Sequence, residues 1–338
     1  MAASSRPLLT ALVFAASLAI ALGLGEIGAR LAAPFLLFDG EIVFTMRPHT
    51  GHEGVPMESR GGVVMWRFPR DDRPPPRAEK QGFRIVVPGD SVLFPGLVAD
   101  ADGAARRLEW LLNEHLDGGP YEVVNLAEPA FNTAQEERML LDAGFPLAPD
   151  LVLVGVTPND EQEFAFHNGQ LLEVRFLHDM RARRDAAGFG PLARASYLYN
   201  WLWLLLEGAK AEPPSGDVDP LIEAPLRRMH AAARERNARL AVMCFPEYKS
   251  RDAEQLDPAR DRCRFQRVAE WAAEAGVPYL DLVSAEAPYR IRDISMDNIH
   301  RSPYGHEVDA VAIFDWLVDG HVVPYRAIRS RPKPPPPR

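Results

Sequence analysis

Ser91 is the residue whose surroundings most clearly suggest covalent chemistry. It closes the stretch 83–91 (FRIVVPGDS), in which a short apolar run ends in Gly-Asp-Ser. The β-branched run 85–87 predicts a buried strand, because such residues pack well on a pleated surface. Gly89 permits a sharp exit from that strand. Ser91 would then lie just beyond the carboxyl end of the strand, where open α/β sheets place ligand sites. A hydroxyl there is a candidate nucleophile, and it needs a base.

The elements that would position Ser91 alternate between strands and helices. Further strands are predicted from apolar runs at 121–126, 150–157, 240–245 and 277–282. Helices are predicted from periodic patterns at 102–116, 134–143, 221–237, 264–275 and 307–318. The near-continuous run at 150–157 is typical of a parallel strand that is covered on both faces. This alternation predicts a doubly wound α/β sheet.

Composition narrows the classes of partner and cofactor. The chain has 338 residues and a net charge of -9, with no basic block in its middle, which argues against nucleic acid as a partner. Its two cysteines form no CxxC or Cys/His array, so a zinc site is not supported. Asp297, His300 and His306 have metal-binding side chains but no metalloenzyme pattern, and we predict no cofactor. Cys244 is predicted to be a buried apolar residue, and a disulfide to Cys263 stays open for an oxidising compartment.

The N-terminus, residues 1–30, is predicted to be a signal-anchor. The uncharged stretch at 7–25 is about as long as a bilayer-spanning helix requires. Arg6 in front of it gives a positive-inside signal that would leave the bulk of the chain outside the cytoplasm. The stretch is longer than a usual signal-peptide core, so an uncleaved anchor is favoured over a cleaved signal. Glu26 and Arg30 follow at i, i+4, so the helix is expected to continue with a local ion pair.

Three segments stand apart from the alternating pattern. Residues 31–81 are predicted to be an irregular linker, with edge-strand character at 62–67. An insertion at 161–215 contains the apolar and aromatic segment 196–206 (SYLYNWLWLLL), which is too short to span a membrane. That segment is predicted to be a helix packed on the core, with a substrate wall or a membrane contact as alternatives. The Pro-rich tail at 326–338 is expected to be extended and disordered.

Three short blocks resemble those of the SGNH/GDSL hydrolases. They are Gly89-Asp90-Ser91 after a strand, Asn159-Asp160 after a later strand, and Asp297-x-x-His300 near the C-terminus. A lone Gly-Asp-Ser is a weak signal, but three blocks in the expected order, each at the end of the expected element, are a strong one. For the domain at 82–325 the resemblance implies a three-layer, mostly parallel, flavodoxin-like sheet. The N-terminal anchor resembles membrane-tethered bacterial members of the family.

The resemblance implies a role for each matching residue. Ser91 would be the nucleophile, and His300 would be the general base that later returns the proton to the leaving alcohol. Asp297 would hold the imidazole in the right tautomer and stabilise its cation; the i, i+3 spacing lets the two side chains meet locally. The side-chain amide of Asn159 would join the backbone N–H groups of Ser91 and Ala130 in an oxyanion hole.

One block departs from the family's pattern. Residues 125–133 (NLAEPAFNT) resemble Asn-x-Gly-x-x-Gly-x-Asn-Thr, but Ala127 and Ala130 replace both glycines. Ala130 still carries an N–H, although a Cβ costs about 1 kcal/mol or more if the position needs positive φ. Pro158 before Asn159 is a second departure, and it would stiffen that loop.

Several of these residues also have purely structural interpretations. Gly89 and Asp90 are expected to support the turn that carries Ser91, and Asp160 is expected to support its loop rather than act in chemistry. Ser91 or Asp90 would also suit the start of a helix as a cap. His300, taken alone, is compatible with an ordinary surface histidine.

Together these features predict an extracytoplasmic, membrane-tethered serine esterase that works through an acyl-Ser91 intermediate. By resemblance, its substrate would be an O-acetyl group on an envelope or exopolysaccharide glycan. Its location would be the bacterial inner membrane, single-pass through residues 7–25, with the catalytic domain in the periplasm. The alternatives are secretion after signal cleavage, a lipid ester as substrate, and acyl transfer to a sugar hydroxyl. From a different class, Ala127 and Ala130 leave open a catalytically weak glycan-binding module.

Overall fold

The chain divides into two compact units. The computed structural model describes residues 5–32, 55–60, 63–67, 79–157, 160, 164–167, 170–173, 196–199, 202, 206, 220–246, 248, 256, 266–297 and 299–337. One unit comprises Met1–Phe44 and Ala165–Ser215, and the other comprises Thr45–Phe164 and Gly216–Arg338. Most of the predicted insertion therefore belongs to the same unit as the N-terminal helix.

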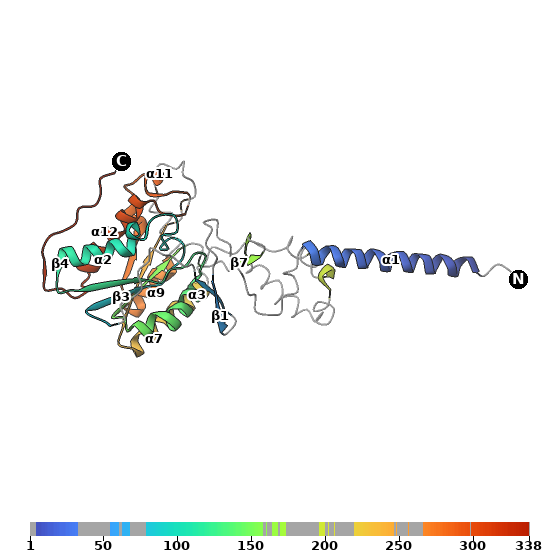
Figure 1. Ribbon diagram of the computed structural model, residues 1–338, viewed down its shortest axis with the longest axis horizontal. Helices are drawn as coiled ribbons and strands as arrows, with labels where there is room; N and C mark the ends of the chain where they lie inside the picture. The colour runs from blue at the N-terminus through green and yellow to red at the C-terminus, as the bar shows by residue number, and fades with distance from the viewer. Residues whose placement is uncertain are drawn as a thin grey trace. The chain divides into compact units, whose positions relative to one another are not determined.

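A five-stranded parallel sheet forms the centre of the second unit (Figure 1). Its strands are β3 (Phe83–Val87), β5 (Tyr121–Asn125), β6 (Leu151–Val156), β9 (Arg239–Cys244) and β10 (Tyr279–Asp281). They lie in the order β10-β9-β6-β3-β5, and every neighbouring pair is parallel. Numbered along the chain, this is the 2-1-3-4-5 order of flavodoxin-like sheets. The predicted doubly wound fold is confirmed.

The central strands are apolar on both faces because helices cover both. Every residue of β6 is buried, and the β-branched run of β3 is buried with it. The register pairs Val86 with Val124 on one side and with Val152 on the other. A strand in this position needs no polar alternation, which is why it appears in the sequence as a continuous apolar run.

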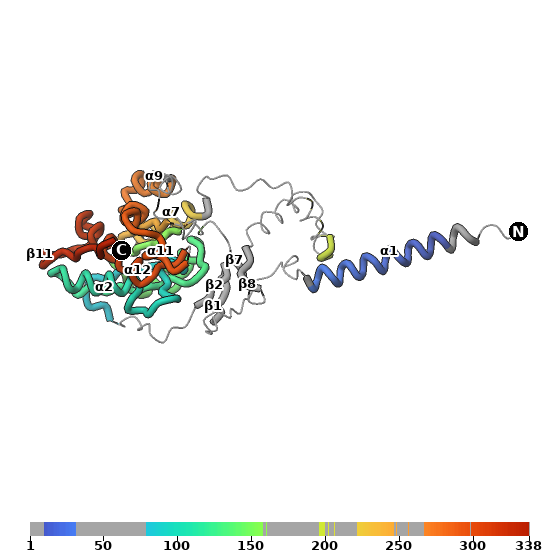
Figure 2. The backbone as a smooth tube through the Cα atoms, turned by 90° about the horizontal axis from the view of Figure 1, so that it is seen from above, coloured from blue at the N-terminus to red at the C-terminus, as the bar shows by residue number. Residues whose placement is uncertain are grey.

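Helices cover the sheet on two faces (Figure 1). One face carries α2 (Ala104–His115) and α12 (Pro303–Asp319), which pack side by side (Figure 2). The short helices α10 (Leu282–Glu286) and α11 (Ile291–Ile294) pack against α12. The other face carries α3 (Thr133–Met139), α7 (Pro220–Glu235) and α9 (Gln266–Ala275). The result is the three-layer arrangement expected for this sheet.

Two helices differ from their predicted bounds for local reasons. The helix α12 begins at Pro303 rather than 307, because the Ser302 hydroxyl accepts the Gly305 N–H at 3.1 Å and proline suits the first helical position. The helix α3 ends at Met139 and passes into a π-helical turn, Leu140–Gly144, and then a 3-10 turn, Phe145–Leu147. The predicted single helix at 134–143 is thus correct only in its first part.

Two small antiparallel sheets accompany the main sheet in the second unit. The strand predicted at 62–67 is β2 (Val63–Arg67), but it pairs antiparallel with β1 (Val55–Arg60) instead of extending the main sheet. The pair β4 (Leu116–Asp117) and β11 (Ala327–Ile328) is also antiparallel. A further pair, β7 (Phe164–His167) and β8 (Gln170–Glu173), follows β6 in the chain and belongs, apart from Phe164, to the first unit.

The C-terminal tail is extended, as expected, but it is held against the second unit instead of being disordered. The Tyr289 hydroxyl donates to the Pro335 carbonyl at 2.9 Å, and the Tyr304 hydroxyl donates to the Pro336 carbonyl. Both tyrosines are buried, and buried hydroxyls need partners. Proline lacks an N–H but keeps its carbonyl acceptor, so a Pro-rich tail can satisfy them.

Cys244 ends β9 as a buried free thiol, which confirms the prediction of a small buried residue. Burial raises the pKa of this thiol, so it is not a candidate nucleophile. Cys263, its open disulfide partner, lies outside the described residues.

The first unit contains α1 (Ser5–Ala32), which is long and apolar enough to cross a membrane over Thr10–Leu31, with a mean hydropathy of 1.9. A signal sequence would meet the same criterion. The predicted continuation of the helix is confirmed, because the Arg30 Nε donates to the Glu26 Oε1 at 2.9 Å.

Candidate active site

Ser91 lies on a turn that starts where β3 ends, and the turn is fixed from both sides. The Gly89 carbonyl accepts the Glu128 N–H at 3.0 Å, on the β5 side. The Pro88 carbonyl accepts the Gly155 N–H at 3.2 Å, on the β6 side. The chain order of the sheet reverses at this point, and open α/β sheets form their ligand crevices there. Ser91 itself is half-buried.

Asp90 supports this turn from below. It is fully buried, and its Oδ1 accepts the Val92 N–H at 2.9 Å. Its Oδ2 accepts the Thr157 hydroxyl, also at 2.9 Å. Thr157 directly follows β6, so this bond ties the serine turn to the loop that leaves the neighbouring strand. At Gly89 a Cβ would lie 2.6 Å from Leu93 Cδ1, so the tight turn favours glycine there.

Asp160 belongs to the same network. Its Oδ2 accepts the Thr157 N–H at 3.0 Å, and its Oδ1 lies 3.1 Å from the Thr157 hydroxyl oxygen. That hydroxyl has one proton, and Asp90 accepts it. A proton on Asp160 would complete the second contact by donating back to Thr157. Burial, and then the negative charge of Asp90, raise the pKa of Asp160 well above its ordinary value, which favours this protonated form.

Glu136, on α3, is the third buried acid beneath the serine turn. Both of its carboxylate oxygens are buried without a hydrogen-bond partner among the described residues. Burial, followed by repulsion from Asp160 and Asp90, raises its pKa well above the ordinary value. We call Asp90, Glu136 and Asp160 the carboxylate cluster. Asn159, the predicted side-chain donor, lies between Thr157 and Asp160 but outside the described residues.

Asp297 and His300 form the contact that their spacing predicts. The His300 Nδ1 lies 2.6 Å from the Asp297 Oδ2, and the Asp297 Oδ1 accepts the N–H groups of Ile299 and His300 at 2.7 and 2.6 Å. Burial acts to raise the pKa of Asp297, but these hydrogen bonds outweigh it and the pKa lies below the ordinary value. Asp297 is therefore ionised at neutral pH.

An ionised Asp297 fixes the tautomer of His300. A carboxylate only accepts hydrogen bonds, so the nitrogen that faces it, Nδ1, must carry a proton. In neutral His300 the other nitrogen, Nε2, is then an unprotonated acceptor. This is the state that a general base requires. The His300 side chain is half-buried, with 32% of its surface exposed.

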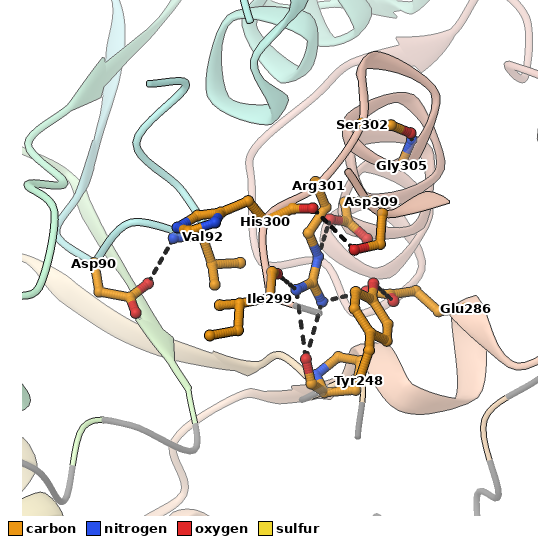
Figure 3. A network of polar contacts seen from close by, with 12 residues as sticks. Asp90, Val92, Tyr248, Glu286, Ile299, His300, Arg301, Ser302, Gly305 and Asp309 are labelled. Carbon is orange, nitrogen blue, oxygen red and sulfur yellow. Dashed lines mark hydrogen bonds and ion pairs between the residues drawn. The ribbon is translucent and has the colours of Figure 1, made fainter. Parts of the chain in front are cut away.

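Arg301, the next residue, holds the histidine loop from inside the protein (Figure 3). It is fully buried, and its Nη2 donates to the Glu286 Oε1 at 2.7 Å. Its Nε lies 3.4 Å from the Asp309 Oδ2, and its Nη1 donates to the Ile299 carbonyl at 2.9 Å. The guanidinium also lies 4.7 Å from the ring centroid of Tyr248. We call Glu286, Arg301 and Asp309 the arginine cluster.

The same arginine places the histidine loop at the carboxyl edge of the sheet. Its guanidinium nitrogens Nη1 and Nη2 lie 3.4 Å from the carbonyl of Pro246, which follows the end of β9. Ser91 follows the end of β3, and carboxyl ends of parallel strands meet at one edge. In Figure 3 the His300 ring points from its loop toward the turn that contains Asp90 and Val92. The sheet thus brings the predicted nucleophile and base to the same edge.

His306 lies in α12, behind the histidine loop. Burial, and then the charges of Arg301, Arg107 and His300, lower its pKa to about 3. It is neutral at every pH at which the protein would work. Within the described ranges, no group of three or more His, Cys, Asp or Glu residues could hold a metal ion, and Asp297, His300 and His306 form no such group.

The second block passes beside the serine turn, and its alanines differ in conformation. Ala130 has a φ of 61°, in the left-handed region that favours glycine. The position does need a positive φ, so the Cβ of Ala130 lowers the stability of the fold by about 1 kcal/mol relative to glycine. Ala127 is buried and is not among the positive-φ residues. Asn125, which begins the block, donates to the Leu93 carbonyl at 2.9 Å and so ties it to the serine turn.

Sequence reasoning missed three residues of the site. Arg301 was recognisable only as the neighbour of His300, and Thr157 only as the last residue of an apolar run. Glu136 lies on a short polar helix, whose pattern gives no sign that one carboxylate is buried.

No protein-family profile matches the chain, and no curated protein matches it in sequence. Solved structures do match. One is a protein assigned to the G-D-S-L lipolytic family from Desulfitobacterium hafniense, with 13% identity and a TM-score of 0.41 over 69% of this chain and 99% of that one. Another is the esterase EstA from a Pseudoalteromonas species, with 11% identity and a TM-score of 0.41 over 71% and 99%.

A third similar structure is a catalytic mutant of the acetylxylan esterase Axe2 from Geobacillus stearothermophilus. Its identity is 16% and its TM-score is 0.43, over 70% of this chain and 94% of that one. At identities of 11% to 16% the roles of individual residues follow from the geometry of this chain alone.

Proposed function

We propose that this protein is a membrane-anchored serine esterase in which Ser91, His300 and Asp297 form the catalytic triad. The observation that carries the proposal is the Asp297–His300 pair. An ionised carboxylate 2.6 Å from Nδ1 leaves Nε2 as the acceptor, on the edge of the sheet where the Ser91 turn also lies.

In the acylation step, the Ser91 Oγ attacks the ester carbonyl while the Nε2 of His300 takes its proton. Asp297 stabilises the imidazolium that results, because its charge lies beside the Nδ1 proton. The tetrahedral intermediate then collapses, and the departing alcohol oxygen receives the proton from Nε2. Ser91 keeps the acyl group as an ester.

The negative charge on the intermediate needs donors. The proposed donors are the backbone N–H groups of Ser91 and Ala130 and the side-chain amide of Asn159. The left-handed conformation of Ala130 supports this role, because it is the backbone state that glycine, the residue expected at this position of the block, adopts readily. One preorganised donor contributes ~3 kcal/mol to an acyl-transfer barrier.

Deacylation uses the same groups in reverse. Water attacks the acyl carbonyl, the Nε2 of His300 takes a proton from it, and Ser91 leaves with that proton. We propose an O-acetyl ester of an extracytoplasmic glycan as the substrate, with α1 anchoring the protein in the inner membrane and the second unit in the periplasm. Arg6 before the apolar stretch supports that orientation.

Turnover of acyl esters by the full chain in detergent tests the function. We expect hydrolysis of a p-nitrophenyl acetate probe and acetate release from O-acetylated xylan, both lost in Ser91→Ala. Ser330→Ala is the matched control, because this serine is exposed and its hydroxyl forms a hydrogen bond with His115 near the C-terminal tail. Ester turnover that survives Ser91→Ala would overturn the proposed nucleophile, and a folded wild-type protein without any turnover would overturn the esterase.

A further inference from the structure

The insertion starts a helix directly on α1, within the first unit. The Glu26 carboxylate accepts three hydrogen bonds from it: from the Ser196 hydroxyl at 2.8 Å, from the Tyr197 N–H at 2.9 Å and from the Leu198 N–H at 3.0 Å. The Ser196 oxygen in turn accepts the Tyr199 N–H at 3.1 Å. The first three N–H groups of this helix are thus satisfied, two of them by a carboxylate from another helix.

Two further contacts complete this joint. The Arg30 guanidinium lies 4.6 Å from the ring centroid of Tyr197 while it pairs with Glu26. At Gly25 a Cβ would lie 2.9 Å from the Leu198 Cδ2, so the two helices approach closely because this residue is glycine. A cap, an ion pair, a cation–π contact and a glycine contact make the joint specific. Cleavage of α1 as a signal peptide would remove the Glu26 cap.

The position of the joint along α1 is informative. The apolar stretch 7–25 is ~28 Å long at a rise of ~1.5 Å per residue, close to the ~30 Å hydrocarbon core of a bilayer. Glu26 directly follows that stretch, so with α1 as the proposed anchor and 7–25 as its hydrocarbon span, Glu26 would lie at the boundary between acyl chains and headgroups. A carboxylate at that depth needs partners, and the insertion helix supplies three donors in addition to Arg30.

Leu198, Leu202 and Leu206, which are all described and all helical, are apolar. Leu198, Leu202 and Leu206 are spaced i, i+4 and i+8, which places them on one side of a helix. Leu202 is 46% exposed and Leu206 is 67% exposed. Two large apolar side chains in water would be unfavourable, and they follow a joint at the level of the bilayer boundary.

We propose that Leu202 and Leu206 lie in the membrane–water interface and that the partner of these two side chains is the bilayer itself. The inference rests on the proposed anchor role of α1 and is independent of the esterase chemistry. Glu26 then sets the depth at which the segment 196–206 starts. The composition of the segment, with Tyr199 and two tryptophans between the leucines, is that of interfacial anchors.

Nitroxide labels on the full chain in lipid nanodiscs test this placement. The label is attached at Leu202→Cys or Leu206→Cys in a Cys263→Ser background, since Cys244 is buried. Leu97→Cys, in the second unit and 49% exposed, is the matched control. We expect collision with a water-soluble nickel chelate at 202 and 206 to be at least about threefold weaker than at 97, and collision with oxygen to be stronger.

Glu26→Ala should increase the motion of labels at 202 and 206 and leave the label at 97 unchanged. Nickel collision at 202 and 206 equal to that at 97 would overturn the inference. So would dipolar coupling between labels on two chains, because it would assign these two side chains to a second copy. Ester turnover in the same nanodiscs separates the two proposals: active protein with water-exposed labels contradicts only the interfacial placement, and inactive protein with lipid-protected labels contradicts only the esterase.

Discussion

The arginine cluster and the carboxylate cluster are both buried at the carboxyl edge of the sheet, but their charges are balanced in different ways. In the arginine cluster, Arg301 pairs with Glu286, and a proton remains favoured on Asp309, because burial and the charge of Glu286 raise its pKa. In the carboxylate cluster, no described cation contacts Asp160 or Glu136, and both have raised pKa values.

The difference corresponds to what each cluster supports. The arginine cluster holds the loop that presents Asp297 and His300, where an ionised acid and a protonatable base must keep one geometry. The carboxylate cluster lies beside the Ser91 turn, where burial and the charge of Asp90 favour the protonated, neutral forms of Asp160 and Glu136. Since an unpaired buried charge is costly, Arg301 balances the charge of Glu286, whereas protonation removes the charges of Asp160 and Glu136.

The largest difference in activity should come from replacing an aspartate by asparagine at the histidine loop and in the carboxylate cluster. Asp297→Asn should lower kcat/KM about 10³–10⁴-fold, because the amide no longer favours the Nδ1-protonated tautomer or the imidazolium. Asp160→Asn should lower it less than about threefold, because an amide resembles the protonated acid. Ester kinetics at pH 8 measure both. Equal losses of kcat/KM in the two variants would contradict an ionised Asp297 and a protonated Asp160.

Removal of the cation should be the most destabilising change. Arg301→Met leaves the charge of Glu286 buried without compensation, and we expect the free energy of unfolding to fall by about 3–5 kcal/mol. Denaturant titration measures this, and Arg331→Met, which removes only exposed ion pairs, should cost less than about 1 kcal/mol. The double variant Arg301→Met/Glu286→Gln should recover part of the loss. A stable Arg301→Met protein would contradict the pairing.

The raised pKa of Glu136 should make the free energy of unfolding depend on pH. A raised pKa means that folded Glu136 holds its proton above the ordinary value of 4.5, so its contribution to stability is lost as pH rises through the raised pKa. The difference in unfolding free energy between Glu136→Gln and the wild type should therefore shift in favour of the variant by about 1–3 kcal/mol between pH 4.5 and pH 8. Glu137→Gln, which alters a surface ion pair with Arg228, should show no such trend. If the unfolding free energies of Glu136→Gln and the wild type change with pH in parallel, Glu136 is not protonated in the folded protein.

The smallest effect concerns the two alanines of the second block. Ala130→Gly should stabilise the protein by up to about 1 kcal/mol, because glycine tolerates a positive φ. Ala127→Gly should destabilise it by about 0.5–1 kcal/mol, because it lies outside that region and its buried methyl group is lost. Thermal unfolding of both variants checks the opposite signs, and the same sign for both would contradict the role of backbone conformation.

The sheet was predictable from sequence because its strands are apolar on both faces and appear as continuous runs. The Asp297–His300 contact was predictable because it is local. The buried states of Glu136, Thr157 and Arg301 were not, since tertiary contacts decide which polar side chains are buried. The contact of residues 196–199 with α1 was not predicted either, because apolar composition does not identify the partner of a segment. Asn159 stays a prediction.

Labelling of Ser91 by a fluorophosphonate tests the central claim most directly. Intact-mass and peptide mass spectrometry of the full chain in detergent should show one stoichiometric adduct on Ser91. The adduct should be absent in Ser91→Ala and should form at least about 10²-fold more slowly in His300→Ala, because the hydroxyl then lacks its base. A folded wild-type protein that forms no adduct, or that is labelled equally fast without His300, would contradict an activated serine at this edge of the sheet.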